Sequence, residues 1–337
     1  MLSGIAGSCG QDPGPPIDPV LQQLRHWVPY RSSAGLFFLH RFEMREVDVA
    51  RVLPGWGTKH VSRTPDLPAV NLDQGQAWVV ARSYLGRLPS LDEWRFAVGG
   101  NIGFRFPWGN REPNPSYANT SELALRRRTR VGTFESGRDP SGQGCYDLIG
   151  NVAEWTSTPL ALHPLAIESL TARFDPQRDE IRQVEQVLPL SPFLAGVVPW
   201  MPELMSTDAA DPLRYCAVGF SYAESLRVRE ISFSPDTLMA GSYWDDQGAY
   251  PLDPRESSSL LGVRLATDPY TFLARLETHR GSPTPGDVQA LAHFLLSYRM
   301  DFERAAKLRA GLHRDLLGLD PPSPLALEAW RLLGIDR

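Results

Sequence analysis

The sequence predicts an α+β protein that is rich in ordered loops and carries a helical C-terminal extension. Three observations lead to this class. The 337 residues include 28 glycines, 30 prolines and 9 tryptophans, and such a density of turn formers favours a loop-rich fold over a helical bundle. Short apolar runs and short amphipathic stretches alternate up to about residue 268. From Pro269 onward the apolar spacing becomes helical.

The bulk composition excludes several classes of protein. With 42% hydrophobic and 22% charged residues and a formal net charge of −5, the chain has an ordinary globular composition. Mild acidity argues against a nucleic-acid-binding protein, so we expect no nucleic-acid partner. No apolar stretch approaches the roughly 20 residues that span a bilayer. The three cysteines, Cys9, Cys145 and Cys216, are too few for a disulfide scaffold.

Residues 1–20 are expected to form a disordered tail or a lipoprotein linker. Cys9 follows the small residues "AGS" (6–8) and precedes a Gly/Pro-rich stretch, which resembles the cleavage box of a bacterial lipoprotein with a shortened signal. The segment lacks a basic n-region and a full apolar h-region, so a chance cysteine in a disordered tail stays open. A lipid anchor at Cys9 would place the protein in the bacterial cell envelope if the native start lies upstream. Otherwise we expect it in the cytoplasm.

The next hundred residues predict one strand and several short helices. The apolar run 37–39 predicts a strand, and a helix can begin at Glu46. The stretch "LDQGQAWVVARSYLG" (72–86) carries an apolar helical face that ends at Gly86. That face consists of Ala77, Val80, Ala81, Tyr84 and Leu85.

The helix that follows has recognisable start and stop signals. Ser90 and Glu93 have the spacing of a capping box, in which each side chain accepts a hydrogen bond from the backbone N–H of the other residue. The pair at 99–100 is Gly-Gly, which ends helices. We therefore expect a helix over about 91–99.

Residues 101–158 predict irregular loops, and one of them is basic. The run "RRRTR" (126–130) suits either a solvated loop or a phosphate site. We favour the solvated loop because isolated charge runs are mostly exposed.

The second half of the chain changes character twice. Helical stretches broken at Pro176 come first, and "TLMAGSYW" (237–244) and "LLGVRLA" (260–266) then predict strands. From 269 onward amphipathic helices carry an apolar stripe that must be buried against something. The stripe consists of Val288, Leu291, Leu295 and Leu296, followed by Phe302, Ala305, Leu308 and Leu312.

Six motifs in order resemble the formylglycine-generating-enzyme (sulfatase-modifying-factor) domain. They are the "DLPAVNLDQGQAWVVARSYLGRLPSLDEWRFAV" segment, "FPWGN", "VGTF", "GCYDLIGNVAEWT", "MAGSYW" and "GVRLA". The stretch "FFLHRFEMREVDVARV" also resembles the N-terminal segment of that family. The resemblance assigns residues 21–268 to this domain, with an insertion at about 157–239, and residues 269–337 to a helical extension.

The resemblance implies a variant of the C-type-lectin-like fold, with short helices around a small twisted sheet. Four tryptophans within the motifs are then expected to be core residues that hold the loops: Trp94, Trp108, Trp155 and Trp244.

The resemblance also defines which chemistry to look for. Family members that oxidise a sulfatase cysteine to formylglycine use two cysteines that bind copper(I), an ion that selects soft thiolates. The matching positions here hold Asp245 and Tyr250, so we expect no copper and no formylglycine generation. Cys145 stands where the family usually has leucine, and we expect it to be a small buried hydrophobe.

A second branch of the fold, the iron-dependent sulfoxide synthases, takes histidine ligands mainly from an attached helical bundle. None of the seven histidines here belongs to an H-x3-H-x-E type cluster, so we do not expect that chemistry. They are His26, His40, His60, His163, His279, His293 and His313.

The corner "GCYDLIGNVAEWTST" (144–158) is the candidate metal site. Gly150-Asn151 is a turn signal, and the resemblance implies that the corner wraps calcium, an ion that prefers oxygen ligands. The implied ligands are the Asp147 side chain, the carbonyls of Gly150 and Val152, and the Glu154 carboxylate. The alternative is that Glu154 only accepts backbone N–H bonds. A second ion site of the family would begin at Asn119, but its later acidic ligand has no counterpart here, so we do not predict it.

Two functions fit these observations. The first is a non-catalytic binding or scaffolding protein, a pseudoenzyme with a protein partner, in which the insertion and the extension fold onto the domain and form one face opposite the old catalytic cleft. The second is an enzyme with different chemistry in that cleft, whose candidate residues are Tyr243, Trp244, Asp245, Asp246 and Arg255. Adjacent aspartates on a strand point to opposite faces, which weakens their use as an acid–base pair. The binding protein is therefore favoured, and the composition does not predict its oligomeric state.

Overall fold

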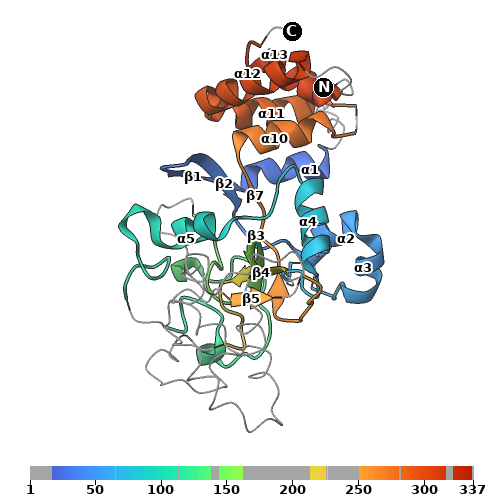
Figure 1. The fold of residues 1–337 in the computed structure, drawn as a ribbon. Helices are drawn as coiled ribbons and strands as arrows, with labels where there is room; N and C mark the ends of the chain where they lie inside the picture. The colour runs from blue at the N-terminus through green and yellow to red at the C-terminus, as the bar shows by residue number, and fades with distance from the viewer. Residues whose placement is uncertain are drawn as a thin grey trace, which may run out of the picture. The chain divides into compact units, whose positions relative to one another are not determined.

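The computed structural model describes residues 17–64, 66–111, 114–137, 144–161, 213–224, 226, 250–252, 254–280, 282–315 and 322–335 (Figure 1). The chain divides into two compact units. The core unit runs from His26 to Thr271, and the helical unit joins the segment up to Arg25 to Phe272–Arg337. The core unit contains both helices and strands, as the predicted α+β class requires. Within the described residues, no helix is long and apolar enough to cross a membrane.

Two small sheets form the framework of the core unit. In the first, β1 (Trp27–Ser32) and β2 (Gly35–His40) form an antiparallel hairpin, and β7 (Ala266–Thr267) pairs antiparallel with β2. The second has the order β5-β4-β3-β6, in which only the pairing of β3 with β6 is parallel. Its strands are β3 (Ala153–Ala161), β4 (Leu213–Val218), β5 (Tyr250–Leu252) and β6 (Leu261–Gly262).

The strand predicted at 37–39 is confirmed as the buried centre of β2. The preceding strand β1 was not predicted, because Pro29 and Arg31 interrupt its apolar pattern. Proline is tolerated there because β1 is the edge strand of its sheet. Pairing with β2, rather than intrinsic propensity, defines this strand.

Four helices follow β2 and precede β3 in the sequence: α2 (Glu46–Val52), α3 (Pro54–His60), α4 (Gln74–Ser83) and α5 (Leu91–Gly99). All five residues of the predicted apolar face on 72–86 are buried. Helix α4 starts at an Asp73–Gln76 capping box and ends before the predicted stop at Gly86. Single 3₁₀ turns occupy Gln23–His26, Gly100–Ile102, Ser121–Leu123 and Glu135–Gly137.

Helix α5 begins and ends as predicted. The Ser90 hydroxyl accepts from the Glu93 N–H at 3.1 Å, and the Glu93 carboxylate accepts from the Ser90 N–H at 2.9 Å. Gly100 follows the last turn with a φ of 59°, which glycine adopts without strain. The same carboxylate also pairs with Arg87 at 2.5 Å, which connects the helix to the segment before it.

One predicted strand needs correction. "LLGVRLA" does not form one strand, because its first residues pair with β3 as β6 and its last pairs with β2 as β7. The insertion at 157–239 stays a prediction; within it, residues 159–161 of β3 pair with β4. The strand predicted at 237–244 and the helices predicted around Pro176 lie outside the described residues.

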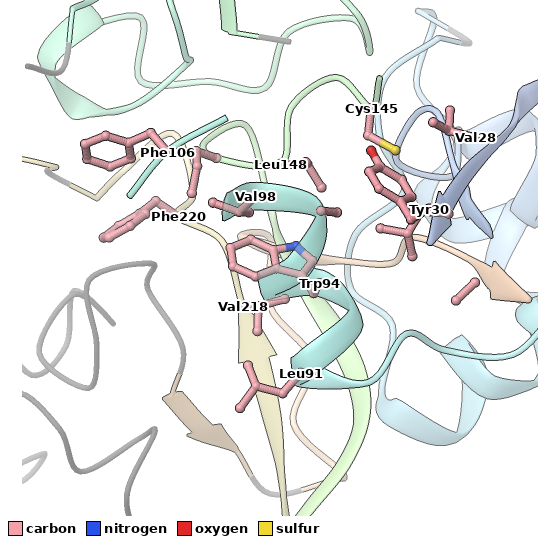
Figure 2. Packing of buried hydrophobic residues seen from close by; sticks show 14 of the residues in the cluster. Val28, Tyr30, Leu91, Trp94, Val98, Phe106, Cys145, Leu148, Val218 and Phe220 are labelled. Atoms are coloured by element: carbon pink, nitrogen blue, oxygen red, sulfur yellow. The ribbon is translucent and has the colours of Figure 1, made fainter. Parts of the chain in front are cut away.

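The core of this unit collects aromatic and aliphatic side chains from both sheets and from α5. Figure 2 shows Leu91, Trp94 and Val98 of α5 beside Val218 of β4 and the Phe220 ring. Trp94, Trp108 and Trp155 are at most 4% exposed, which confirms three of the four predicted core tryptophans. Trp244 lies outside the described residues.

The helical unit contains α1 (Pro19–Gln22), α10 (Pro269–Glu277), α11 (Pro285–Ser297), α12 (Arg299–Asp315) and α13 (Pro324–Leu332) (Figure 1). Helix α1 begins at Pro19, inside the stretch expected to be a tail. The Asp18 N–H donates to the Asp287 carboxylate at 2.7 Å, which fixes this N-terminal segment to α11.

The predicted apolar stripe of the extension is partly right. Leu291, Leu295, Phe302 and Ala305 are buried, whereas Leu296 and Leu308 are 44% and 60% exposed. Leu296 follows the buried Leu295 directly in α11, about 100° further around the helix axis, and therefore lies off the buried face. The centre of the unit is instead a cluster of three rings, Phe272, Phe294 and Phe302, with centroids 5.1 to 5.7 Å apart.

Candidate functional site

The corner at 144–154 adopts the tight backbone that its glycine and asparagine predict. Asp147, Gly150 and Asn151 have positive φ angles of 52°, 89° and 63°. A Cβ atom on Gly150 would lie 2.7 Å from the Asn119 carbonyl oxygen, so no larger side chain fits there without a shift. The turn thus brings the corner against the loop that contains Asn119.

Asn151 is the centre of a buried hydrogen-bond network. Its side-chain N–H donates to Glu43 at 2.7 Å, and its Oδ1 accepts from the Thr129 N–H at 2.9 Å. The Asn119 side chain also donates to Asn151, at 3.2 Å. The second oxygen of Glu43 accepts from the Val152 N–H at 3.1 Å. The corner therefore holds three chain segments together.

Glu154 has a partner that the sequence did not reveal. Arg264 and Glu154 are 0% and 1% exposed in their side chains, and their closest nitrogen and oxygen are 2.6 Å apart. The Arg264 Nε also donates to both Glu154 oxygens, at 2.9 and 3.0 Å. The other guanidinium N–H groups donate to the carbonyls of His40, Tyr146 and Asp147. One buried cation thus binds both the carboxylate and the backbone of the corner.

Asp147 is buried but only half satisfied. Its Oδ2 accepts from the Gly132 N–H at 2.7 Å, and its Oδ1 has no hydrogen-bond partner among the described residues. Burial raises the pKa of Asp147 to about 6, against the Gly132 hydrogen bond and the Arg264 charge, which lower it. Burial, together with the nearby charges of Asp147 and Glu154, raises the pKa of Glu43 well above its usual value.

The charges of the corner are unbalanced. Glu43, Asp147 and Glu154 are three buried carboxylates. The positive charge of Arg264 lowers the pKa of each of them. Buried charges are costly unless they are paired, so this site must take up protons or a cation. A hard cation fits Asp147, which has an oxygen without a donor, better than Glu154, whose oxygens Arg264 already binds. Among the described side chains, no group of three or more His, Cys, Asp or Glu residues has the arrangement of a metal site.

The remaining predicted residues are dispersed. The two described cysteines, Cys145 and Cys216, are 0% exposed, which confirms the expectation for Cys145 as a buried hydrophobe. Asn119 donates to Asn151 and to the Arg127 carbonyl. Arg255 is exposed. The other cleft candidates, Tyr243, Trp244, Asp245 and Asp246, lie outside the described residues, as do Cys9 and His163.

Two described histidines lie next to each other without forming a metal site. The rings of His26 and His40 are 5.5 Å apart. The His40 Nδ1 is 2.8 Å from the Phe42 carbonyl, and burial lowers the pKa of His40 to about 3. His40 is thus a neutral core residue near neutral pH.

Sequence reasoning missed Glu43 and Arg264, which complete the corner. A signal was present for Arg264, which is the charged residue of the otherwise apolar run "LLGVRLA". The signal for Glu43 was weaker, because "FFLHRFEM" also contains His40 and Arg41. A buried charged residue needs a partner; Arg264 finds Glu154, and Glu43 accepts hydrogen bonds from the Asn151 side chain and the Val152 N–H.

Comparison with known proteins identifies the domain family. The model of the sulfatase-modifying factor enzyme 1-like domain matches residues 37–225. The chain is 28% identical over 137 residues to the formylglycine-generating enzyme of Bos taurus, which covers 36% of each protein. It is 34% identical over 151 residues to a hercynine oxygenase of Mycolicibacterium smegmatis, which covers 42% of this chain and 33% of the relative.

A third relative is described as inactive. The chain is 34% identical over 157 residues to the inactive C-alpha-formylglycine-generating enzyme 2 of Bos taurus, which covers 41% of this chain and 43% of the relative. The chain therefore spans less than half of the length of each of these three relatives. The family match covers more than half of the chain and includes the corner, α4 and α5. The chain belongs to the sulfatase-modifying factor enzyme 1-like (formylglycine-generating-enzyme) domain family and has its α+β fold.

Proposed function

We propose that this chain is a non-catalytic binding or scaffolding protein built on a formylglycine-generating-enzyme-like domain. The observation that carries the proposal is the burial of Cys145 and Cys216 in the core unit. A copper(I) site of two thiolates needs two accessible cysteines. The chain has three cysteines, and with two of them buried only Cys9 is left, which cannot form such a pair alone.

The helical unit supports a binding role. Its helices α11 to α13 lie outside residues 37–225, which match the family. Several apolar side chains on them are exposed rather than packed: Leu296, Met300, Leu308 and Leu327 are 44%, 81%, 60% and 42% exposed. Where such side chains gather into one patch, they mark a protein interaction surface. We therefore expect a protein partner.

An enzyme with different chemistry is the second candidate. The relatives include a formylglycine-generating enzyme and a hercynine oxygenase, so one domain family carries at least two activities. In this case the old cleft would use residues of the group Tyr243, Trp244, Asp245, Asp246 and Arg255. Function lies in the site rather than in the fold. An oxidation assay on a sulfatase-type cysteine peptide distinguishes formylglycine generation from other chemistry.

The direct test of the proposal is an oxidation assay on a sulfatase-type cysteine peptide. With copper(I) and oxygen supplied, we expect no aldehyde product above a buffer control by mass spectrometry. The formylglycine-generating enzyme of Thermomonospora curvata serves as the positive control. Turnover by this chain that Cys9→Ser abolishes would contradict the argument from the buried cysteines.

The proposal also includes a structural calcium ion at the corner, held by the Asp147 side chain, the carbonyls of Gly150 and Val152, and Glu154. The unpaired Asp147 Oδ1 and the excess of buried carboxylates support it. Because Arg264 binds both Glu154 oxygens, we expect Asp147 to be the stronger ligand and Glu154 to share its oxygens with the guanidinium.

We expect calcium to raise the melting temperature of the chain and EDTA to reverse the shift. At a calcium concentration 100 times the Kd, the gain is about 2.7 kcal/mol. Asp147→Asn, which keeps the size of the side chain, should remove most of the shift, whereas Asp92→Asn at an exposed position of α5 should not. Equal shifts in both variants, or none in the parent chain, would mean that the corner is held by hydrogen bonds and Arg264 alone.

A further inference from the structure

Residues 127–130 of the basic run form part of the wall of a cavity in the core unit, and none of the cysteines or calcium ligands lines it. The cavity has a volume of about 420 Å³, and residues 127–130 line it together with Thr64, Leu67 and Thr133. Ligand pockets in proteins usually occupy about 300–1,000 Å³. The sequence is compatible with either a solvated loop or a phosphate site. A cavity at this loop favours the phosphate site.

The loop is held in place by its backbone. The Arg127 carbonyl accepts from the Asn119 side chain at 2.9 Å, and the Thr129 N–H donates to Asn151 at 2.9 Å. The Val131 N–H donates to the Asp66 carbonyl at 3.0 Å. Anchors on both sides of the arginines fix the cavity wall before any ligand arrives, which reduces the entropic cost of binding.

Of the three arginines that line the cavity, one is paired and two are not paired within the described residues. Arg128 pairs with the buried Glu46 at 2.9 Å and is part of the wall. Arg127 and Arg130 are exposed, and neither guanidinium has a hydrogen bond or ion pair within the described part of the chain.

The nearby carboxylates do not neutralise these two charges. Asp66 pairs with Arg45 at 3.1 Å, and Asp48 pairs with Arg45 and Arg51 at 2.7 and 3.2 Å. Two free guanidinium groups therefore line one cavity of a chain whose net charge is −5. A local positive field of this kind attracts anions.

We propose that this cavity binds a phosphate-like oxyanion carried on a small organic molecule. Arg127 and Arg130 donate to the oxyanion, because the planar guanidinium fork matches tetrahedral oxyanions in a bidentate manner. The Thr64 hydroxyl adds a neutral donor at the same cavity. Leu67 supplies apolar surface for the organic part, and the volume exceeds what a bare ion requires.

The test is a calorimetric titration of the full chain with phenyl phosphate and with inorganic phosphate, at constant ionic strength in chloride. We expect saturable binding of both, with phenyl phosphate the tighter ligand. Arg127→Gln and Arg130→Gln should each weaken phenyl phosphate binding about tenfold or more, which corresponds to about 1.4 kcal/mol. Arg126→Gln is the matched control, since Arg126 belongs to the same exposed run but does not line the cavity.

Three results would overturn the proposal. No saturable binding of either ligand would mean that the loop is only solvated. An equal loss in Arg126→Gln would indicate general charge attraction rather than a site. Tight binding of a single-stranded oligonucleotide without binding of phenyl phosphate would assign the loop to a nucleic-acid backbone. Equal affinity for both phosphates would overturn the role of Leu67. No cysteine and no calcium ligand lines the cavity. Failure of the phosphate proposal would therefore not contradict the proposed function.

Discussion

Replacement of Arg264 by leucine is expected to lower the free energy of unfolding by about 3–5 kcal/mol, measured by urea denaturation in calcium-free buffer. The substitution leaves Glu154 buried without its cation, next to Asp147 and Glu43. It also removes the donors of three backbone carbonyls. Arg264→Lys should recover only part of the loss, because an ammonium group has three donors and no planar fork.

Two further variants separate the buried pair from a general effect of charge. Arg51→Leu is the matched control, since Arg51 is 49% exposed and Asp48 keeps Arg45 as a partner. Its effect should stay below about 1 kcal/mol. The double variant Arg264→Leu/Glu154→Leu should be more stable than Arg264→Leu alone, because it no longer buries an unpaired carboxylate at that position. If the double variant is the less stable of the two, the charge argument fails and side-chain packing explains the loss.

Truncation of Trp155 to alanine is expected to cost about 3–5 kcal/mol, the range for large aromatic side chains in cores. Trp155 is 0% exposed, and its indole N–H donates to the Leu72 carbonyl at 2.8 Å. The substitution leaves a cavity beside β3 and a backbone acceptor without its donor. The melting temperature of the core unit, followed by tryptophan fluorescence and near-UV circular dichroism, reports the change.

The control for this variant is Trp78→Ala on α4. Trp78 is 42% exposed, so its truncation removes little buried area and should shift the stability by less than about 1 kcal/mol. Trp155→Phe should lie between the two, since it keeps most of the ring but loses the hydrogen bond. Similar losses in Trp78→Ala and Trp155→Ala would show that the corner tryptophan does not hold the core together.

Short sequence motifs correctly predicted those elements that are determined by interactions between residues close in the sequence. The capping box at Ser90 fixed the start of α5, because its hydrogen bonds lie within one helical turn. The apolar face of α4 was right at all five positions, because helical periodicity selects the buried side by itself. Gly150-Asn151 predicted a turn, and both residues have a positive φ.

Partnerships between distant segments could not be predicted in this way. Arg264 and Glu154 are 110 residues apart, and Asn151 and Glu43 are 108 residues apart. Strand β1 contains a proline, and it exists because β2 pairs with it. The stripe of the extension failed at Leu296 and Leu308 because each lies off the buried face of its own helix: Leu296 is about 100° around α11 from Leu295, and Leu308 is about 240° around α12 from Phe302.

The sequence by itself determined the family, the short helices and the corner, because each depends on residue types at fixed short spacing. The tertiary structure alone decided that Cys216 is buried, that Arg264 neutralises Glu154, and that the basic run lines a cavity. Burial, charge pairing and cavities arise where segments far apart in the chain meet. Their free energies therefore depend on the whole fold and not on any one stretch of residues.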